Sequence, residues 1–323
     1  MDNTIWIEKY RPNNFSEIIG QDKNIQMLSK MLSSGSLPHL LFHGKSGTGK
    51  TSTIMSLVKQ LYGKNKTFMM MRLDASDDRG INTVREEIKG FADKMTPFNN
   101  GIKLIILDEA DSMTSEAQFA LRRIIEKYSD NTRFCLICNY ENKIIPAIKA
   151  RCVNIRFYPI KKEIIINKLK SICSQEKIDY TEDSIESIGL ISNGDLRKAI
   201  NMLQSTSMMN NKITSNLCYD STGIPTPKLT EEVFNILINP KYNFETTYEY
   251  MKHNILDNGI LLSFLCQQLT LYMVNQIINN CLHKHYLSII IDMAKLECDV
   301  SISTFNDIYI VGLISIFKKN DFE

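Results

Sequence analysis

No sign of charge dominates this chain of 323 residues, which carries 38 Lys and Arg against 36 Asp and Glu, for a formal net charge of +2 at pH 7. A nearly neutral protein has no global positive field to attract nucleic acid or another polyanion. Any polyanion site must therefore be local. The apolar fraction of 43% and the charged fraction of 23% are those of an ordinary globular protein, long enough for two or three domains.

The eight cysteines are scattered singly, apart from Cys135 and Cys138. That pair lies in the apolar run "RFCLICN", and no second CxxC supplies the other half of a zinc site. We expect reduced thiols in the core of an intracellular protein. The sequence indicates no metal cluster, no redox chemistry and no nucleophilic triad.

Long uninterrupted apolar runs are also missing. The N-terminal residues "MDNTIWIEKYRP" contain no apolar signal region. The most apolar long stretch, 259–278, is interrupted by Gln267, Gln268, Asn275 and Gln276. A membrane-spanning segment carries few such groups, so this stretch predicts a buried or interface helix and no membrane contact.

One short stretch, "GKSGTGKT" at 44–51, is rich in glycine and carries chemistry. Its spacing, G-x-x-x-x-G-K-T, allows a tight loop to point backbone N–H groups at phosphates. Lys50 would reach the β- and γ-phosphates, and the Thr51 hydroxyl would hold Mg²⁺. These eight residues alone do not distinguish a kinase, a GTPase or a motor.

The surroundings of the loop support a phosphate-binding role. The apolar run at 37–44 predicts a strand before it, and Gly63 closes a predicted helix after it. Four apolar residues of that helix recur at the spacing i, i+3, i+4, i+7: Ile54, Leu57, Val58 and Leu61. The loop therefore has the strand-to-helix context that a true phosphate loop needs.

Further strands are predicted at 102–111, 132–139 and 150–157, with helices between them. Nearly continuous apolar runs are typical of buried parallel strands, so the first 160 residues indicate a parallel α/β sheet. From residue 161 only helical periodicity is visible. A stretch at 219–232 with two prolines and a glycine predicts a linker, and the rest of the chain is helical and apolar. We therefore divide the chain into domains at 1–160, 161–225 and 226–323.

Acidic and amide side chains follow two of the predicted strands. An aspartate at position 108 can hold Mg²⁺, and Glu109 can orient and polarise a water for attack on the γ-phosphate. Asn139, at the end of another strand, is a candidate to position that water or simply a turn residue. Arg151 and Arg197 are candidates to supply a guanidinium to the γ-phosphate, although each alone is more often a surface charge.

Several motifs occur together and in a fixed order: "WIEKYRP", "GKSGTGKT", "DASDDRGI", "LDEADSMTSEAQFALRR", "RFCLICN", "ARC" and "GDLRKAINMLQS". In this order they resemble the boxes of the replication factor C small subunits, which are AAA+ ATPases of the sliding-clamp loader. The resemblance covers residues 4–205. It implies an α/β fold in which a RecA-like AAA+ parallel-sheet domain is followed by a small helical lid and an all-helical C-terminal collar for oligomerisation.

The resemblance implies a role for each matching position. Asp108 and Thr51 would hold Mg²⁺, Glu109 and Lys50 would act in hydrolysis, Asn139 would be sensor 1, and Arg197 would be sensor 2 acting in cis. The residues implied to bind ATP are Ile7, Tyr10, Arg11, Ile19, Gly44, Lys45, Ser46, Gly47, Thr48, Gly49, Lys50, Thr51, Ser52, Asn139 and Arg197. Lys45 and Ser46 stand where the family usually has two prolines.

Arg151 matches the arginine finger of the family's Ser-Arg-Cys motif, which completes a neighbouring subunit's ATP site in trans. The serine of that motif is Ala150 here. The resemblance also implies partners: other replication factor C subunits in a heteropentamer, the sliding clamp PCNA and primer-template DNA. The compartment would be the nucleus, with a viral factory or an archaeal cytoplasm left open.

Contacts to DNA and to the clamp follow from the same resemblance. Arg79, Arg85 and Lys143 would contact DNA phosphates, so that a few charges per subunit, summed over a ring, hold DNA in a salt-dependent way. Met95 and Phe98 would dock on the clamp, although packing on their own domain is equally compatible with the sequence.

Three functions remain open from the sequence. The first is an ATP-driven motor subunit, which the intact Glu109 favours. The second is a mainly structural subunit that supplies Arg151 and clamp contacts. The third is a homohexameric AAA+ DNA helicase, which should carry a winged-helix domain where this chain has an apolar helical segment from about 228.

Overall fold

The computed structural model describes residues 5–75, 80–94, 101–210, 212–279, 286–302 and 306–318. The chain divides into two compact units, one formed by residues 1–178 and 188–204 and the other by residues 179–187 and 205–323. The three-domain division predicted from the sequence stays a prediction.

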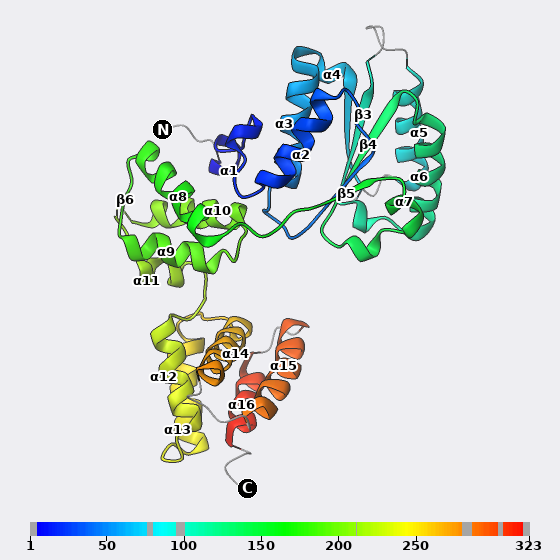
Figure 1. Cartoon of the computed structure of the whole chain (residues 1–323). Helices are drawn as coiled ribbons and strands as arrows, with labels where there is room; N and C mark the ends of the chain where they lie inside the picture. The colour runs from blue at the N-terminus through cyan, green and yellow to red at the C-terminus, as the bar shows by residue number, and fades with distance from the viewer. Residues whose placement is uncertain are drawn as a thin grey trace. The chain divides into compact units, whose positions relative to one another are not determined.

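The first unit is built on a five-stranded parallel sheet of described residues with the strand order β2-β3-β4-β1-β5 (Figure 1). Its strands are β1 (Leu40–His43), β2 (Met70–Asp74), β3 (Lys103–Asp108), β4 (Thr132–Cys138) and β5 (Val153–Arg156). All pairings are parallel, so the carboxyl ends of the strands meet at one edge. The α/β class and the strands predicted around 40, 105, 135 and 155 are confirmed.

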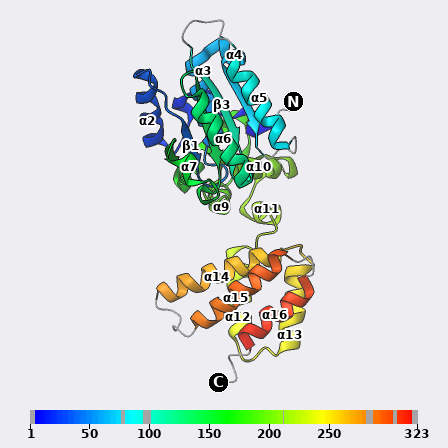
Figure 2. The same cartoon turned by 90° about the vertical axis from the view of Figure 1, so that its right-hand side faces the viewer.

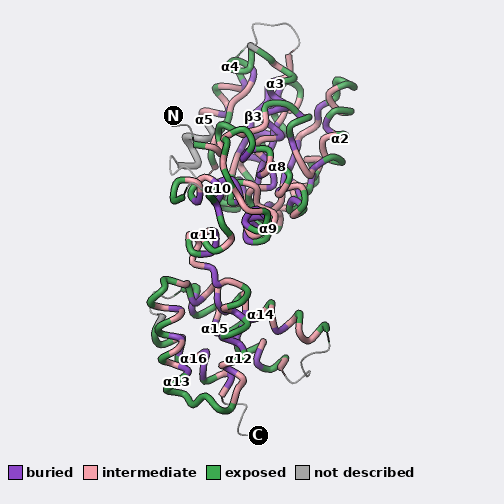
Figure 3. Tube along the Cα trace, turned by 90° about the vertical axis from the view of Figure 1, so that its left-hand side faces the viewer, coloured by how far each residue is buried: buried purple, intermediate pink, exposed green. Residues whose placement is uncertain are grey.

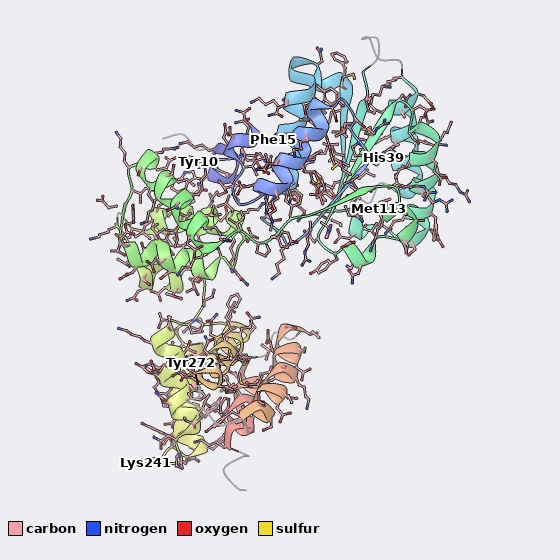
Figure 4. All side chains as sticks on the ribbon, in the orientation of Figure 1. Tyr10, Phe15, His39, Met113, Lys241 and Tyr272 are labelled. Carbon is pink, nitrogen blue, oxygen red and sulfur yellow. The ribbon has the colours of Figure 1, made fainter. Side chains whose placement is uncertain are left out.

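Helices cover both faces of this sheet, which is why the strands are apolar without alternation. On one face α2 (Asp22–Ser33) and α3 (Lys50–Tyr62) pack against side chains such as Phe42 and Ile106. On the other face α5 (Gly80–Asp93) and α6 (Ser115–Tyr128) pack against the alternate residues, such as Leu41 and Ile105. The buried positions of β3 stand out in Figure 3.

The edge strand β2 was not predicted. Its residues are half-buried or exposed, and its sequence "MMRLD" carries two charges, so it lacks the apolar run that identified the other strands. Short helices complete the sheet part of the unit: α1 (Trp6–Lys9), α4 (Lys66–Met69), α7 (Pro146–Lys149) and 3-10 turns at Phe15–Glu17, Gly63–Asn65, Ala110–Ser112 and Glu141–Lys143.

The helices after the sheet are α8 (Lys162–Glu176), α9 (Glu182–Ile191) and α10 (Leu196–Met209), as the helical periodicity predicts. The first unit contains α8 and α10 as far as residue 204, and these two are called the lid helices below. The second unit contains a short parallel pair of strands, β6 (Asp179–Tyr180) and β7 (Lys212–Ile213), which helical periodicity alone could not reveal.

The predicted linker at 219–232 is too long. Helix α11 (Ser215–Asp220) and helix α12 (Pro227–Ile238) take up its ends, so only residues 221–226 lie between helices. The Thr226 hydroxyl accepts a hydrogen bond from Leu229 N at 3.2 Å and caps α12. Proline is compatible with the first turn of a helix, which is why Pro227 begins one instead of extending the linker.

The remainder of the second unit is helical, as predicted: α13 (Phe244–Met251), a π-helical turn (Lys252–Leu256), α14 (Leu262–Ile278), α15 (Tyr286–Ile302) and α16 (Asn306–Lys318). Helices α14 and α15 lie side by side (Figure 2). One core joins α12 to α16, and α14 contributes Leu262, Leu265, Cys266, Leu269 and Met273 to it. None of the described helices has the length and hydropathy that crossing a membrane requires.

Candidate nucleotide-binding site

The glycine-rich loop connects the end of β1 to the start of α3, as the sequence predicts. Gly44, with φ of +146°, lies so close to the residue that follows β5 that a Cβ there would stand 2.2 Å from Phe157 O. Lys50 is 7% exposed and its Nζ donates to Gly44 O at 2.7 Å, Lys45 O at 2.9 Å and Asn139 Oδ1 at 2.9 Å. Burial lowers the pKa of Lys50, although the nearby carboxylates of Asp108 and Asp111 oppose this shift.

A cavity of about 250 Å³ opens beside this loop in the first unit. It is bounded by the loop, the carboxyl edge of the sheet, the N-terminal segment and the start of α10. Its predicted lining residues are Ile7, Tyr10, Arg11, Ile19, Ser46, Gly47, Thr48, Gly49, Lys50, Thr51, Ser52, Asp108, Glu109, Asn139 and Arg197. The sequence did not predict the others: Pro12, Ile18, Arg72, Asp74, Ile137, Cys138, Ile160, Leu196 and Ile200.

Thr51 and Asp108 lie at the end of the cavity where a metal ion would be expected. The Thr51 hydroxyl donates to Asp108 Oδ2 at 3.2 Å. The same carboxylate oxygen accepts a hydrogen bond from Arg72 Nη2 on β2 at 2.9 Å. A hydroxyl and a carboxylate fit Mg²⁺, which takes one or two protein oxygens and completes its shell with water and phosphate. Arg72 is an addition that no sequence motif pointed to.

Glu109 has an unusual backbone. Its φ of 52° and ψ of 38° lie in the left-handed region, which costs a residue with a Cβ about 1 kcal/mol. Ser112 holds Glu109 there, because its backbone N and its hydroxyl both donate to Glu109 O, at 2.9 Å and 2.7 Å. The exposed Glu109 side chain lines the cavity next to Asp108. Strain of this kind is concentrated at functional sites.

Asn139 is held by a carboxylate that the sequence analysis did not single out. Asp111 Oδ2 accepts from Asn139 N at 3.2 Å and from Tyr140 N at 3.1 Å, just beyond the end of β4. This fixes the backbone that directs the Asn139 amide at Lys50. The signal for Asp111 was present, since it is the last acid of "DEAD", but nothing in the sequence paired it with Asn139.

Arg197 reaches the cavity from the start of α10, where the lid contacts the glycine-rich loop. Leu196 N donates to Gly47 O at 3.2 Å, and a Cβ on Gly47 would stand 1.7 Å from Asp195 Oδ1. The absence of a side chain at Gly47 therefore lets the two segments meet. Ile200 of the same helix joins Ile7, Tyr10 and Ile19 at the apolar end of the cavity.

Arg151 does not line this cavity. It is exposed, its Nη1 donates to Ala147 O at 2.6 Å, and its other terminal nitrogen pairs with Glu126 on α6. Gly44 and Lys45 contribute their carbonyls to Lys50 without lining the cavity.

The candidates for DNA and clamp contact are only partly described. Lys143 is exposed, with Nζ 5.2 Å from the centroid of the Tyr140 ring. Arg85 falls within α5. Arg79, Met95 and Phe98 lie outside the described residues.

The sheet order, the phosphate loop and the acids at the sheet edge define an ATPase of the AAA class. Residues 40–160 match the model of the ATPase family associated with various cellular activities (AAA), and residues 167–208 match the RCF1/5-like AAA+ ATPase lid domain. Solved structures of the Thermotoga maritima RuvB Holliday junction branch migration motor share the fold, with a TM-score of 0.55 at 15% identity over 82% of this chain and 91% of that chain.

Curated relatives narrow the class. Replication factor C subunit 5 of Homo sapiens is 40% identical over 318 residues, 98% of this chain and 92% of that protein. Replication factor C subunit 3 of Saccharomyces cerevisiae is 43% identical over 242 residues, 73% of this chain and 71% of that protein. The chain belongs to the replication factor C subunits. Residues 124–152 and the "STGIP" segment also predict similarity to the subunit numbered five in the human complex and three in yeast, and the names of these two relatives agree with that prediction.

Proposed function

We propose that this chain is an ATP-dependent subunit of a sliding-clamp loader. In a heteropentamer with other replication factor C subunits it binds ATP, helps to open the sliding clamp PCNA and load it onto primer-template DNA, and hydrolyses ATP to release both. The observation that carries the proposal is that Lys50, Thr51, Asp108, Glu109 and Arg197 line one cavity in a chain of this family.

The chain's residues divide the work on ATP between them. The loop N–H groups and Lys50 bind the β- and γ-phosphates, and Glu109 orients and polarises the attacking water. Asn139, at the end of the neighbouring strand, helps to position that water, and Arg197 reaches the γ-phosphate in cis. Thr51 and Asp108 hold Mg²⁺, which neutralises charge that develops on the phosphate oxygens.

Arg151 acts on a neighbouring subunit. Its exposure and its position outside its own cavity support a role for the guanidinium at a site on another chain. An arginine supplied in trans stabilises the charge of the transition state during γ-phosphate transfer. Glu126 holds Arg151 meanwhile and fixes its direction.

The second unit serves assembly. Its helices α14, α15 and α16 carry large exposed apolar side chains, among them Leu271 at 55%, Ile291 at 60% and Ile308 at 70% exposure. Exposed apolar residues in such number favour an interface with other subunits. Residues 226–323 would form the collar, residues 161–225 the lid and residues 1–160 the ATPase domain.

Nucleic acid and clamp contacts complete the proposal. Arg79, Arg85 and Lys143 contact DNA phosphates, Met95 and Phe98 contact the clamp, and DNA and clamp stimulate hydrolysis. Replication and repair of DNA in the nucleus are the setting that the eukaryotic relatives support.

Native mass spectrometry of the tagged chain, purified from its own cells at low salt, tests this function. The expected mass is that of an assembly with one copy of this chain and four different ATPase subunits. Six identical copies, or a monomer that never gathers partners, would contradict it and would favour the helicase or an adaptor. A reconstituted complex should then load PCNA onto primed DNA only with ATP.

A further inference from the structure

The N-terminal helix α1 is attached to the lid helices by polar contacts. Lys9 Nζ donates to Glu176 Oε1 at 2.6 Å, and the Tyr10 hydroxyl donates to the same oxygen. Trp6 N donates to Gln204 Oε1 at 3.0 Å. Glu176 is the last residue of α8 and Gln204 lies in α10, so these three hydrogen bonds join α1 and the residue after it to both lid helices within the first unit.

The contacts of Glu176 are partly shielded from solvent, so they can contribute to the stability of this part of the structure. The Glu176 side chain is 18% exposed, and hydrogen bonds from Lys9 and Tyr10 lower the pKa of its carboxyl group. Burial raises the pKa of the Tyr10 hydroxyl, and its hydrogen bond to Glu176 raises it further, so this hydroxyl stays a donor. Lys168, also on α8, lies with Nζ 6.0 Å from the centroid of the Tyr10 ring. Charge-assisted hydrogen bonds are stronger than neutral ones.

Helix α1 needs such contacts. It is four residues long and none of them is buried, and so short a helix is not stable by itself. Yet Ile7 and Tyr10 line the apolar end of the nucleotide cavity, together with Ile200 of α10. The phosphate end, in contrast, is built by the loop between β1 and α3 and by Asp108, whereas the hydrogen bonds described for Glu176 go to Lys9 and Tyr10.

We propose that Glu176 is a positioning residue for the base end of the nucleotide site. It holds Lys9 and Tyr10 against α8, so that the apolar wall formed by Ile7 and Tyr10 is attached to the lid helices. A base bound against this wall therefore stabilises the contact between the lid helices and the N-terminal segment. This inference rests on the proposed ATP site. It assigns to the Glu176 contacts a selective effect on the nucleoside part of the ligand.

Isothermal titration of the full-length chain with two ligands, ATP and inorganic tripolyphosphate, each with Mg²⁺, separates the two ends of the site. Glu176→Ala should raise the Kd for ATP about tenfold and leave the Kd for tripolyphosphate unchanged, which corresponds to the loss of about one net charge-assisted hydrogen bond. Glu163→Ala is the matched control, because Glu163 is an exposed glutamate on the same helix. It should change neither Kd.

Two milder variants keep the test valid if Glu176→Ala folds poorly. Glu176→Gln keeps the volume of the side chain, and Tyr10→Phe keeps the ring while it removes the hydroxyl. Both should weaken ATP binding severalfold without an effect on tripolyphosphate. Equal weakening of both ligands, or unchanged ATP binding in all three variants, would overturn the inference. A wild-type chain that binds neither ligand would instead overturn the ATP site itself.

Discussion

Arg72 on β2 and Asp108 on the adjacent strand β3 form an ion pair, with Arg72 Nη2 2.9 Å from Asp108 Oδ2. The same oxygen accepts a hydrogen bond from the hydroxyl of Thr51. Since Mg²⁺ held by Thr51 and Asp108 would use this carboxylate too, the guanidinium and the metal ion compete for it. Arg72 therefore provides a fixed positive charge next to the carboxylate that would bind the metal ion in the proposed site.

Replacing Arg72 by glutamine should make Mg²⁺ bind more tightly. The Arg72 side chain is 41% exposed, so the ion pair contributes about 1 kcal/mol or less, and we expect the Mg²⁺ concentration that half-saturates ATP binding to fall about threefold to fivefold. Calorimetric titration with Mg²⁺ at fixed ATP measures it. Arg123→Gln, on the exposed face of α6, is the control and should change nothing. A higher Mg²⁺ requirement in Arg72→Gln would mean that Arg72 assists the metal or the phosphates.

Replacing Glu109 by glutamine should separate ATP binding from hydrolysis. The amide keeps the size of the side chain but cannot polarise water, so turnover should fall by about 10²- to 10⁴-fold while the Kd for ATP stays the same. Single-turnover hydrolysis is measured in a reconstituted complex whose other subunits carry the equivalent glutamate-to-glutamine change. The hydrolysis that remains in that complex then reports on the site of this chain. Unchanged turnover in that complex would support a mainly structural subunit.

Replacing Arg151 by alanine should affect a neighbour and spare the chain's own site. Arg151 contacts Ala147 and Glu126 and does not line the cavity, so the mutant chain should bind ATP normally. Hydrolysis at the adjacent site should fall about 10³-fold, as for other arginine fingers. Mixing mutant and wild-type subunits during reconstitution locates the loss, and Arg123→Ala provides a matched control. If the mutant chain itself lost ATP binding, a role in trans would be wrong.

A methyl group on Gly47 should push the lid away from the phosphate loop. Its Cβ would stand 1.7 Å from Asp195 Oδ1, and its φ is +64°. Gly35 has a similar φ of +68° but nothing within 4 Å of the added Cβ, so Gly35→Ala carries the same backbone cost of about 1 kcal/mol without a clash. We expect Gly47→Ala to weaken ATP binding at least about tenfold and Gly35→Ala to leave it unchanged. Equal affinities in a calorimetric comparison would show that the lid contact is not needed.

The sequence was most informative where the chain folds locally. The strand, loop and helix from Leu40 to Tyr62 follow from an apolar run, a glycine spacing and a helical period. Asp108 and Glu109 were identifiable because acids at the carboxyl edge of a buried parallel strand have a recognised use.

The contacts that the sequence did not reveal join segments distant along the chain. Arg72 lies on an edge strand without an apolar pattern, and its partner Asp108 is 36 positions away. Glu176 meets Tyr10 across 166 positions. Without an alignment, neither pairing leaves a signal, because Arg72 and Glu176 are each an ordinary charged residue and nothing in the sequence links them to their partners. Strand β2 was missed for the same reason, since the edge of a sheet buries too little to impose a pattern.

His39 should make the first unit less stable in mild acid. Phe134 N donates to His39 Nδ1 at 3.2 Å, a contact that requires the neutral imidazole. Burial lowers the pKa of His39 to about 4, and the charge of Arg133 contributes to the shift. The unfolded chain, with an ordinary histidine pKa near 6.5, then takes up the proton more readily than the folded chain. The free energy of unfolding is therefore unaffected above about pH 6.5 and falls as the pH is lowered from 6.5 towards 4.

Urea denaturation followed by the fluorescence of Trp6, the single tryptophan of the chain, reports on this unit. The wild-type midpoint should decrease between pH 7 and pH 5. In His39→Gln the decrease should be smaller, because a glutamine amide oxygen can accept from Phe134 N without titrating. His253→Gln is the control, since the side chain of His253 is 82% exposed, and it should reproduce the wild-type pH dependence. If His39→Gln loses as much stability as the wild type over this range, the acid sensitivity comes from other groups and the buried imidazole does not set it.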